Sequence, residues 1–241
     1  MNIERILSWL DRTLDVASFD DVSNNGLQLA SSSGEAVRVA FAVDASVAAV
    51  KAAAESGAQL LVVHHGISWG GGIRRIEGGV YGVVKAAIDA NLAIYASHLP
   101  LDAHPVLGNN ARIAAVLGLR RVKRAFSYHG NVIGLVGVAS PATAAALLES
   151  FGVELPAPSG SLVGVCSGGA GEFAEEAKRL GCSLYVTGEA SWGDVIAAQN
   201  CGMRMACCGH YATEVFGVRA LAGAMRRSLK LDVVDLTGTL A

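Results

Sequence analysis

Short apolar runs alternate along most of the chain with segments in which apolar residues recur every three or four positions. Val37–Asp44 (VRVAFAVD) has the length and β-branched content of a buried strand, and Ala45–Ser56 has helical spacing that stops at Gly57. Strands that alternate with helices are typical of parallel sheets covered by helices, so we expect an α/β fold with mainly parallel sheets. Further strands are predicted at Gln59–Val63, Leu92–Ser97, Leu162–Cys166, Ser183–Val186 and Met203–Cys207, and further helices at Tyr81–Ala90, Asn110–Leu117, Glu172–Leu180 and Trp192–Gln199.

The second half of the chain repeats the order of the first. VVHH (residues 62–65) corresponds to YVTGE (residues 185–189), and YASH (residues 95–98) corresponds to CCGH (residues 207–210). We therefore expect two similar, interlocked α/β lobes, residues 1–125 and 126–241, packed tightly enough to count as a single domain. The second lobe begins with strand material and an alanine-rich helix. In such sheets ligands gather at the carboxyl ends of the strands, so a site is expected in the cleft between the lobes.

Composition and charge narrow the class of protein. The chain of 241 residues is 52% hydrophobic and 17% charged with a formal net charge of -2, which is typical of a folded protein. The amphipathic N-terminus lacks the pattern of a signal peptide and no apolar run is long enough for a membrane helix, so we expect a cytoplasmic protein without a membrane partner. The single basic cluster, Arg120–Arg124 (RRVKR), predicts an exposed face rather than a nucleic-acid site. The five cysteines form no C-x-x-C pair and are expected in the core.

Histidines and carboxylates follow the predicted strands. His64 and His65 end one strand, and because neighbouring strand residues point to opposite faces, the doublet favours either two nearby metal ions or a hydrogen-bonded pair that caps the strand. His98 ends the next strand, and Asp102 follows on a proline-containing loop. His210 and Glu214 are four residues apart at the start of a helix and share one of its faces. Together these groups predict a metal site.

Six motifs occur along the chain in this order: NNGLQL (24–29), VVHHG (62–66), SHLPLD (97–102), CSGGAG (166–171), TGE (187–189) and GHYATE (209–214). Together they resemble the Ngg-one-interacting-factor-three-like family, whose members often carry the name GTP cyclohydrolase I type 2 homologue. The resemblance covers nearly the whole chain and implies a dinuclear metal centre between two α/β lobes and a ring-shaped homohexamer. It implies that His64, His65, Asp102, His210 and Glu214 are the metal ligands, with Glu214 bridging both ions, and that His98 lies among or directly beside them. This chain reads HHG and HLPLD where the family more often has HHP and H-T-N-L-D, which bears on the substrate.

The chemistry of these side chains agrees with that ligand set. Three imidazoles and two carboxylates suit zinc, manganese or iron, and two such ions would activate water and polarise a substrate oxygen. We therefore expect a metal-dependent hydrolase that acts on a small, nucleotide-like substrate, with catalytic roles for His98 and Glu189. The competing class is a non-catalytic metal-binding regulator or assembly scaffold.

Several other residues keep two interpretations. Glu189 is either a general acid or base or an N-cap carboxylate for the following helix. On spacing alone, His104 is as good a candidate ligand as Asp102. The resemblance favours Asp102 and makes His104 a loop residue behind the ligands. His129 is expected to be a turn residue. Trp69 and Trp192 either stack on a planar substrate or pack loops. The glycines 70–72, with Arg74 and Arg75, form either a lid over a phosphate or an ordinary exposed loop. The SGGAG segment (167–171) could offer backbone N–H groups to an anion. It is an incomplete G-x-G-x-x-G motif, so we do not expect a NAD-binding site.

Overall fold

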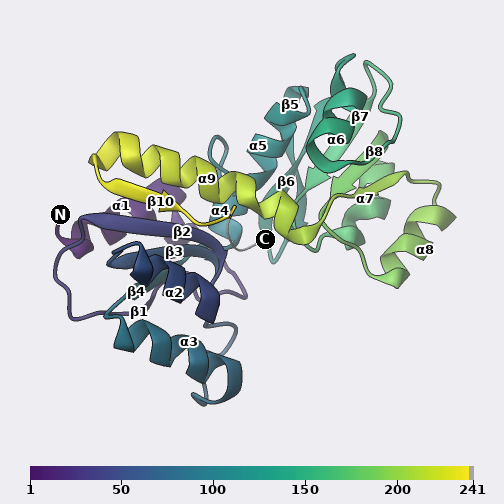
Figure 1. Ribbon diagram of the computed structural model, residues 1–241. Helices are drawn as coiled ribbons and strands as arrows, with labels where there is room; N and C mark the ends of the chain where they lie inside the picture. Colours follow the sequence, from purple (N-terminus) through teal and green to yellow (C-terminus); the bar gives the residue numbers. More distant parts are fainter. Residues whose placement is uncertain (239–241) are drawn as a thin grey trace. The chain divides into compact units, whose positions relative to one another are not determined.

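The computed structural model describes residues 1–238 and shows an α/β protein with two five-stranded mixed sheets. The chain divides into two compact units, each built around one sheet (Figure 1). The first unit comprises Met1–Leu101 with the described residues from Val218 onward, and the second comprises Asp102–Gly217. The predicted lobe boundary after residue 125 falls inside strand β5 of the second unit, and the last strand of the chain belongs to the first unit.

The sheet of the first unit has the strand order β1-β4-β3-β2-β10. Strands β10, β2, β3 and β4 run parallel, and β1 pairs antiparallel with β4 at the edge. The predicted helices and strands between residues 37 and 97 are confirmed, whereas the short edge strands β1 and β10 had no sequence signal. The elements of this unit are α1 (Ile3–Leu14), a 3-10 turn η1 (Val16–Ser18), β1 (Gly26–Leu29), β2 (Arg38–Asp44), α2 (Val47–Glu55), β3 (Leu60–His65), α3 (Gly78–Asp89), β4 (Ala93–Ala96) and β10 (Asp232–Asp235).

Both faces of this sheet are covered. Alternate strand residues such as Ala40, Leu61 and Ile94 pack with α2 and α3 in one apolar cluster. The opposite face carries Tyr95, whose hydroxyl donates a hydrogen bond to Asp11 of α1 at 2.8 Å. Burial on both faces explains why β2, β3 and β4 read as continuous apolar runs.

The sheet of the second unit has the order β5-β6-β7-β8-β9. In this sheet β7, β8 and β9 run parallel, whereas β5 pairs antiparallel with β6 and β6 pairs antiparallel with β7. The prediction of mainly parallel sheets therefore holds for the first sheet and not for the second. The predicted repeat corresponds to parallel strands β2, β3 and β4 of the first unit and to parallel strands β7, β8 and β9 of the second. The elements are α5 (Asn109–Val116), β5 (Arg120–Tyr128), β6 (Asn131–Val138), α6 (Thr143–Phe151), β7 (Leu162–Cys166), η2 (Gly171–Phe173), α7 (Ala174–Arg179), β8 (Cys182–Thr187), α8 (Trp192–Asn200) and β9 (Met205–Cys207).

Two helices cross the boundary between the units along the chain, namely α4 (Leu99–Ala103) and α9 (His210–Leu229). The predicted proline-containing loop after His98 is therefore wrong, because α4 occupies it. Pro100 is tolerated there because the first turn of a helix needs no N–H from that residue.

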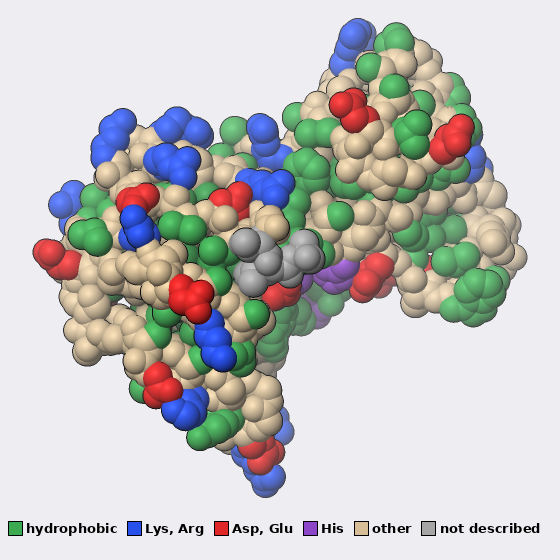
Figure 2. Space-filling model, in the orientation of Figure 1, with side chains coloured by type: hydrophobic (Ala, Val, Ile, Leu, Met, Phe, Trp, Pro, Cys, Tyr) green, Lys and Arg blue, Asp and Glu red, His purple; other side chains and the backbone are tan. Residues whose placement is uncertain are grey.

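Charged side chains are spread over the surface. On the face of the first unit drawn in Figure 2, Lys and Arg side chains alternate with Asp and Glu side chains. The basic cluster Arg120–Arg124 is exposed, as predicted, and lies in edge strand β5. Within residues 1–238, the helices are all too short or too polar to cross a lipid bilayer.

Candidate metal centre

Three histidines of the first unit lie at the carboxyl ends of neighbouring strands. His64 and His65 are the last residues of β3, and His98 follows β4, which pairs with β3 in parallel register. One ring nitrogen from each of the three lies within 4.8 Å of the others. The ring centroids of His64 are 4.6 Å from His65 and 5.1 Å from His98. The cluster therefore has the size of a metal-binding group.

Each of these imidazoles is held through its Nδ1 atom. Nδ1 of His64 lies 2.9 Å from the carbonyl oxygen of Ser97, Nδ1 of His65 lies 2.8 Å from Asp44, and Nδ1 of His98 lies 2.9 Å from Asp21. All three partners are oxygen atoms that only accept, so each Nδ1 carries the proton. Nε2 is then the nitrogen with a lone pair, which is the arrangement by which proteins orient histidine ligands.

Asp44 was missed in the sequence, although its position was informative. It is the last residue of β2 and pairs in register with His65 on β3. The rule that selected the strand-end histidines selects Asp44 equally well. Its role here is to fix the ring of His65.

Asp21 has no such signal, because it lies in the loop before β1 and reaches His98 only through the tertiary fold. Its side chain is 1% exposed. Burial raises the pKa of this carboxyl, but the hydrogen bond and charge of His98, with hydrogen bonds from Asn25 and Ser23, outweigh burial and lower the pKa to about 2. Asp21 is therefore ionised whenever the protein is folded near neutral pH.

Replacement of Asp21 by asparagine is expected to destabilise the protein by about 1–3 kcal/mol. Oδ1 of Asp21 accepts from Ser23 and faces His98, while Oδ2 accepts from the side chain of Asn25 and the backbone N–H of Leu99. An amide group would turn a donor toward other donors on one of these sides. Urea denaturation measures the loss, and Asp89→Asn, at an exposed carboxylate on α3, is the control that should stay near wild type. An unchanged midpoint in Asp21→Asn would contradict this account.

In the second unit, His210 lies between two carboxylates at the start of α9. Its Nδ1 atom is 2.9 Å from Oε1 of Glu189, and its Nε2 atom is 3.0 Å from Oε1 of Glu214. The hydrogen bond to Glu214 is the largest cause that raises the pKa of His210 to about 9, with Glu189 adding to it and burial opposing it. Without metal, His210 is therefore an imidazolium that a metal ion would have to deprotonate at Nε2.

The charge of His210 makes a prediction for the metal-free protein. Its folded pKa of about 9 lies above the ordinary value of 6.5, so its contribution to stability is complete below about pH 6.5 and is lost as the pH rises through about 9. Glu189→Gln should lower this pKa, and Glu175→Gln on α7 should not. NMR titration of the His210 ring after EDTA treatment gives the value directly. A ring that titrates near 6.5 in the wild-type protein would disprove the two-carboxylate arrangement.

Asp102 lies in α4 and is buried, at 7% exposure. Its Oδ1 atom accepts hydrogen bonds from Asn109 at 2.8 Å and from the hydroxyl of Ser167 at 3.1 Å. Ser167 opens the glycine-rich loop after β7, so this loop and α5 together fix the carboxylate. Asn109 was not singled out by the sequence, and Ser167 was noted only as part of the SGGAG loop.

The glycine-rich loop 167–171 makes room for the carboxylates of this unit. A Cβ atom at Gly168 would overlap Oε1 of Glu214, and one at Gly169 would lie 3.4 Å from Oε1 of Glu189. The N–H of Gly168 donates to Thr213 of α9 at 3.0 Å. The loop predicted to offer N–H groups to an anion is therefore packed against α9.

The remaining residues take ordinary positions. Nδ1 of His104 accepts from the backbone N–H groups of Val106 and Leu107, and His129 has φ 47° in the β5–β6 turn, as expected of loop and turn residues. The N-cap interpretation of Glu189 is wrong, because Ser191 caps α8. Trp69 packs with its ring centroid 5.3 Å from that of His98, whereas Trp192 is 76% exposed.

The donors of each unit fit divalent transition metals. The first unit offers three oriented imidazoles. In the second unit His210 and Glu214 lie in contact, whereas Asp102 belongs to neither group of candidate ligands found among the described residues. Zinc, manganese and iron accept such donors, whereas calcium prefers oxygen alone.

Comparison with known proteins gives a full-length match. The sequence profile of Duf34/NIF3 (NGG1p interacting factor 3) matches residues 1–238. A protein of Halobacterium salinarum named GTP cyclohydrolase 1 type 2 homolog is 38% identical over 234 residues, which cover 92% of each chain. A protein of the same name from Archaeoglobus fulgidus is 38% identical over 245 residues, with 98% of each chain covered.

Solved structures give the same result for the fold. The protein ybgI, described as of unknown function, superposes with a TM-score of 0.87 at 30% identity, over 98% of this chain and 97% of that one. A second solved protein, TTHA1606 from Thermus thermophilus, superposes with a TM-score of 0.83 at 29% identity, over 98% of each chain.

Proposed function

The chain belongs to the Duf34/NIF3 family, and on this premise we propose that it binds two divalent metal ions through His64, His65, Asp102, His210 and Glu214. Zinc, manganese and iron are the candidate metals. The ligand set comes from the motifs shared with the family. The donors of each unit, described above, are of the type that it requires, and His210 would bind a metal ion with loss of its Nε2 proton.

The observation that carries this proposal is the common orientation of the histidines in the first unit. Three neighbouring imidazoles each direct Nδ1 toward an oxygen acceptor, which makes Nε2 the ring nitrogen that carries the lone pair. A histidine pair that merely caps the strand would not need the carboxylate of Asp44 behind His65, nor a third ring, His98, held by Asp21 beside it. Two buried or strand-end carboxylates aimed at Nδ1 atoms favour metal ligation.

We further propose that the protein is a metal-dependent hydrolase of a small, nucleotide-like substrate. Bound divalent ions supply activated water and polarise a substrate oxygen. His98, fixed by Asp21, would accept and return a proton at Nε2. Glu189, whose side chain is 63% exposed, would exchange protons with solvent and hold the ring of His210. The name of the relatives, GTP cyclohydrolase 1 type 2 homolog, supports a nucleotide as the first substrate to test.

A homohexameric ring is the assembly that we propose from the family resemblance. Native mass spectrometry of the purified protein tests it. Six chains are expected with intact metal, and a monomer under the same conditions would refute the ring.

The experiment for function combines metal analysis with a turnover screen. Elemental analysis should find two divalent ions per chain, and protein loaded with zinc, manganese or iron is then tested on nucleotides, phosphoesters and cyclic amides. Turnover that disappears in His64→Ala and in Glu214→Ala supports the hydrolase. Two bound ions without turnover, but with metal-dependent partner binding, would make the protein a regulator or scaffold, and protein that retains no metal would refute the site.

A further inference from the structure

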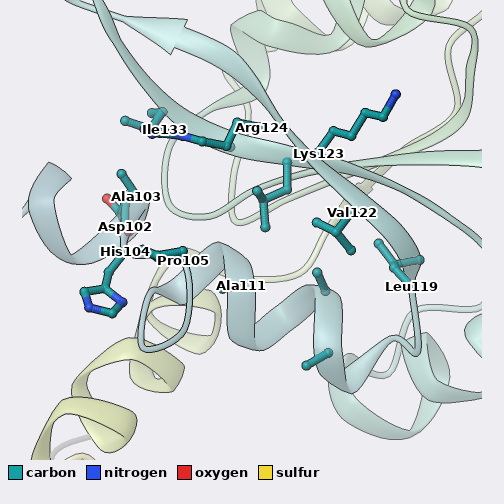
Figure 3. A pocket seen from close by; sticks show the side chains of 14 residues that line it. Asp102, Ala103, His104, Pro105, Ala111, Leu119, Val122, Lys123, Arg124 and Ile133 are labelled. Carbon is teal, nitrogen blue, oxygen red and sulfur yellow. The ribbon is translucent and has the colours of Figure 1, made fainter.

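The second unit contains a pocket that the proposed metal ligands do not explain. It lies between helix α5 and the β5–β6 hairpin and has a volume of about 380 Å³ (Figure 3). Small-molecule sites range from roughly 300 to 1,000 Å³, so the pocket has room for a compact ligand. All the residues that line it belong to the second unit.

The walls of this pocket are mostly apolar. Alanines 111, 114 and 115 of α5 leave the hollow open, because larger side chains at these positions would fill it. Leu119, Val122 and Ile133 close the opposite side (Figure 3). Such walls favour a ligand with an apolar body, such as an aromatic ring.

The rim is basic. Arg124 and Lys123 of β5 are both exposed lining residues, but the ammonium end of Lys123 points away from the pocket in Figure 3, so Arg124 supplies the cation of the rim. Nη2 of Arg124 donates to the carbonyl oxygen of Val132 at 2.6 Å, which ties the guanidinium along the hairpin, toward Ile133 in Figure 3. A guanidinium carries further N–H donors, so Arg124 can bind an anionic group while this hydrogen bond persists.

One acid, Asp102, is among the described residues of the lining. Its Oδ1 atom is already bound by Asn109 and Ser167, as described above. The guanidinium of Arg124 is therefore the cation that an anionic ligand in the pocket would meet.

An edge strand often carries Lys and Arg simply to prevent pairing with another sheet. That explanation suffices for Arg120 and Arg121, which do not line the pocket. It does not account for the combination of Arg124, fixed on the hairpin, with an alanine-walled hollow beside it.

We propose that this pocket binds a small organic anion, with an apolar body against α5 and a carboxylate, phosphate or sulfonate group against Arg124. Binding does not require metal. Because Asp102 also lines the pocket, the occupant lies beside a proposed metal ligand. The anion is therefore the substrate class of the proposed hydrolase, and this last step alone rests on the proposed function.

The test uses two fluorescent probes with similar aromatic bodies, the anionic anilinonaphthalene sulfonate and the neutral N-phenylnaphthylamine. The full-length protein should bind the sulfonate with about one site per chain and more tightly than the neutral probe. Arg124→Gln should weaken sulfonate binding by roughly tenfold to a hundredfold and leave the neutral probe unaffected. Arg124→Lys should restore part of the loss, and Arg120→Gln on the same strand is the matched control.

A second pair of variants tests the cavity itself. Ala115→Leu, which places a larger side chain at the pocket, should lose both probes, whereas Ala145→Leu, at an equally exposed alanine of α6, should bind both normally. Titrations of EDTA-treated protein separate this proposal from the metal site: normal probe binding to metal-free protein supports the pocket even where metal analysis fails. Equal binding of the sulfonate to wild type, Arg124→Gln and Ala115→Leu would overturn the proposal.

Discussion

Replacement of His64 by alanine is expected to lower the affinity for divalent metal by more than about a hundredfold, because loss of a residue that merely orients a ligand already costs about tenfold to a hundredfold. His64 is fully buried at the end of β3, and its Nδ1 atom is held by the carbonyl oxygen of Ser97. Its Nε2 atom has no substitute in the variant. Elemental analysis and competition with a chelating dye measure the loss.

Asp44→Ala should lower the metal affinity by less than His64→Ala does. It leaves His65 in place but removes the carboxylate that fixes its tautomer, so the expected loss is the smaller one, about tenfold to a hundredfold. His129→Asn, in the β5–β6 turn, is the control histidine and should bind metal normally. Because His64→Ala also leaves a space in the core, circular dichroism and urea denaturation in EDTA must show that the variant folds. A folded His64→Ala protein with full metal content would remove His64 from the ligand set.

The sequence predicts best those strands whose two faces are both buried. Strands β2, β3 and β4 are covered on both faces, so their apolar runs stand out in the sequence. Strand β10 lies near the end of the described chain and pairs with β2, which is far from it in the sequence. Because β10 is only four residues long, it has no sequence pattern that would identify it. Strand β5 was read only as a basic surface, because an exposed edge strand need not be apolar.

The same distinction holds for the candidate site. His64, His65 and His98 were predictable because strand ends of a parallel sheet converge, and Asp44 follows from the same rule. Asp21 was not, because its loop meets His98 only through contacts formed after folding. The carboxylate of Glu189 was recognised, but its partner, Nδ1 of His210, became visible only in the structure. Local sequence thus identifies candidate ligands more readily than the groups that orient them.

Gly168→Ala is expected to disturb the carboxylate of Glu214 although it replaces none of the proposed ligands. Gly168 has φ 67°, a left-handed conformation that costs alanine energy, and the added methyl group would overlap Oε1 of Glu214. The strain should lower the free energy of unfolding by about 1–3 kcal/mol. Movement of Glu214 should weaken metal binding as well, and because its carboxylate faces Nε2 of His210, the pKa of His210 in metal-free protein should fall.

Gly169→Ala is the matched control, because it adds the same methyl group at the next residue of the loop. A Cβ atom there would lie at ordinary contact distance, 3.4 Å from Oε1 of Glu189, and 3.6 Å from the ring of His210. This variant should keep its stability, its metal content and the raised pKa of His210. Urea denaturation, elemental analysis and NMR titration of both proteins give the comparison. If Gly168→Ala matched Gly169→Ala in all three, the close approach of the loop to Glu214 would have no part in holding that carboxylate, and Glu214 would have to be positioned by α9 alone.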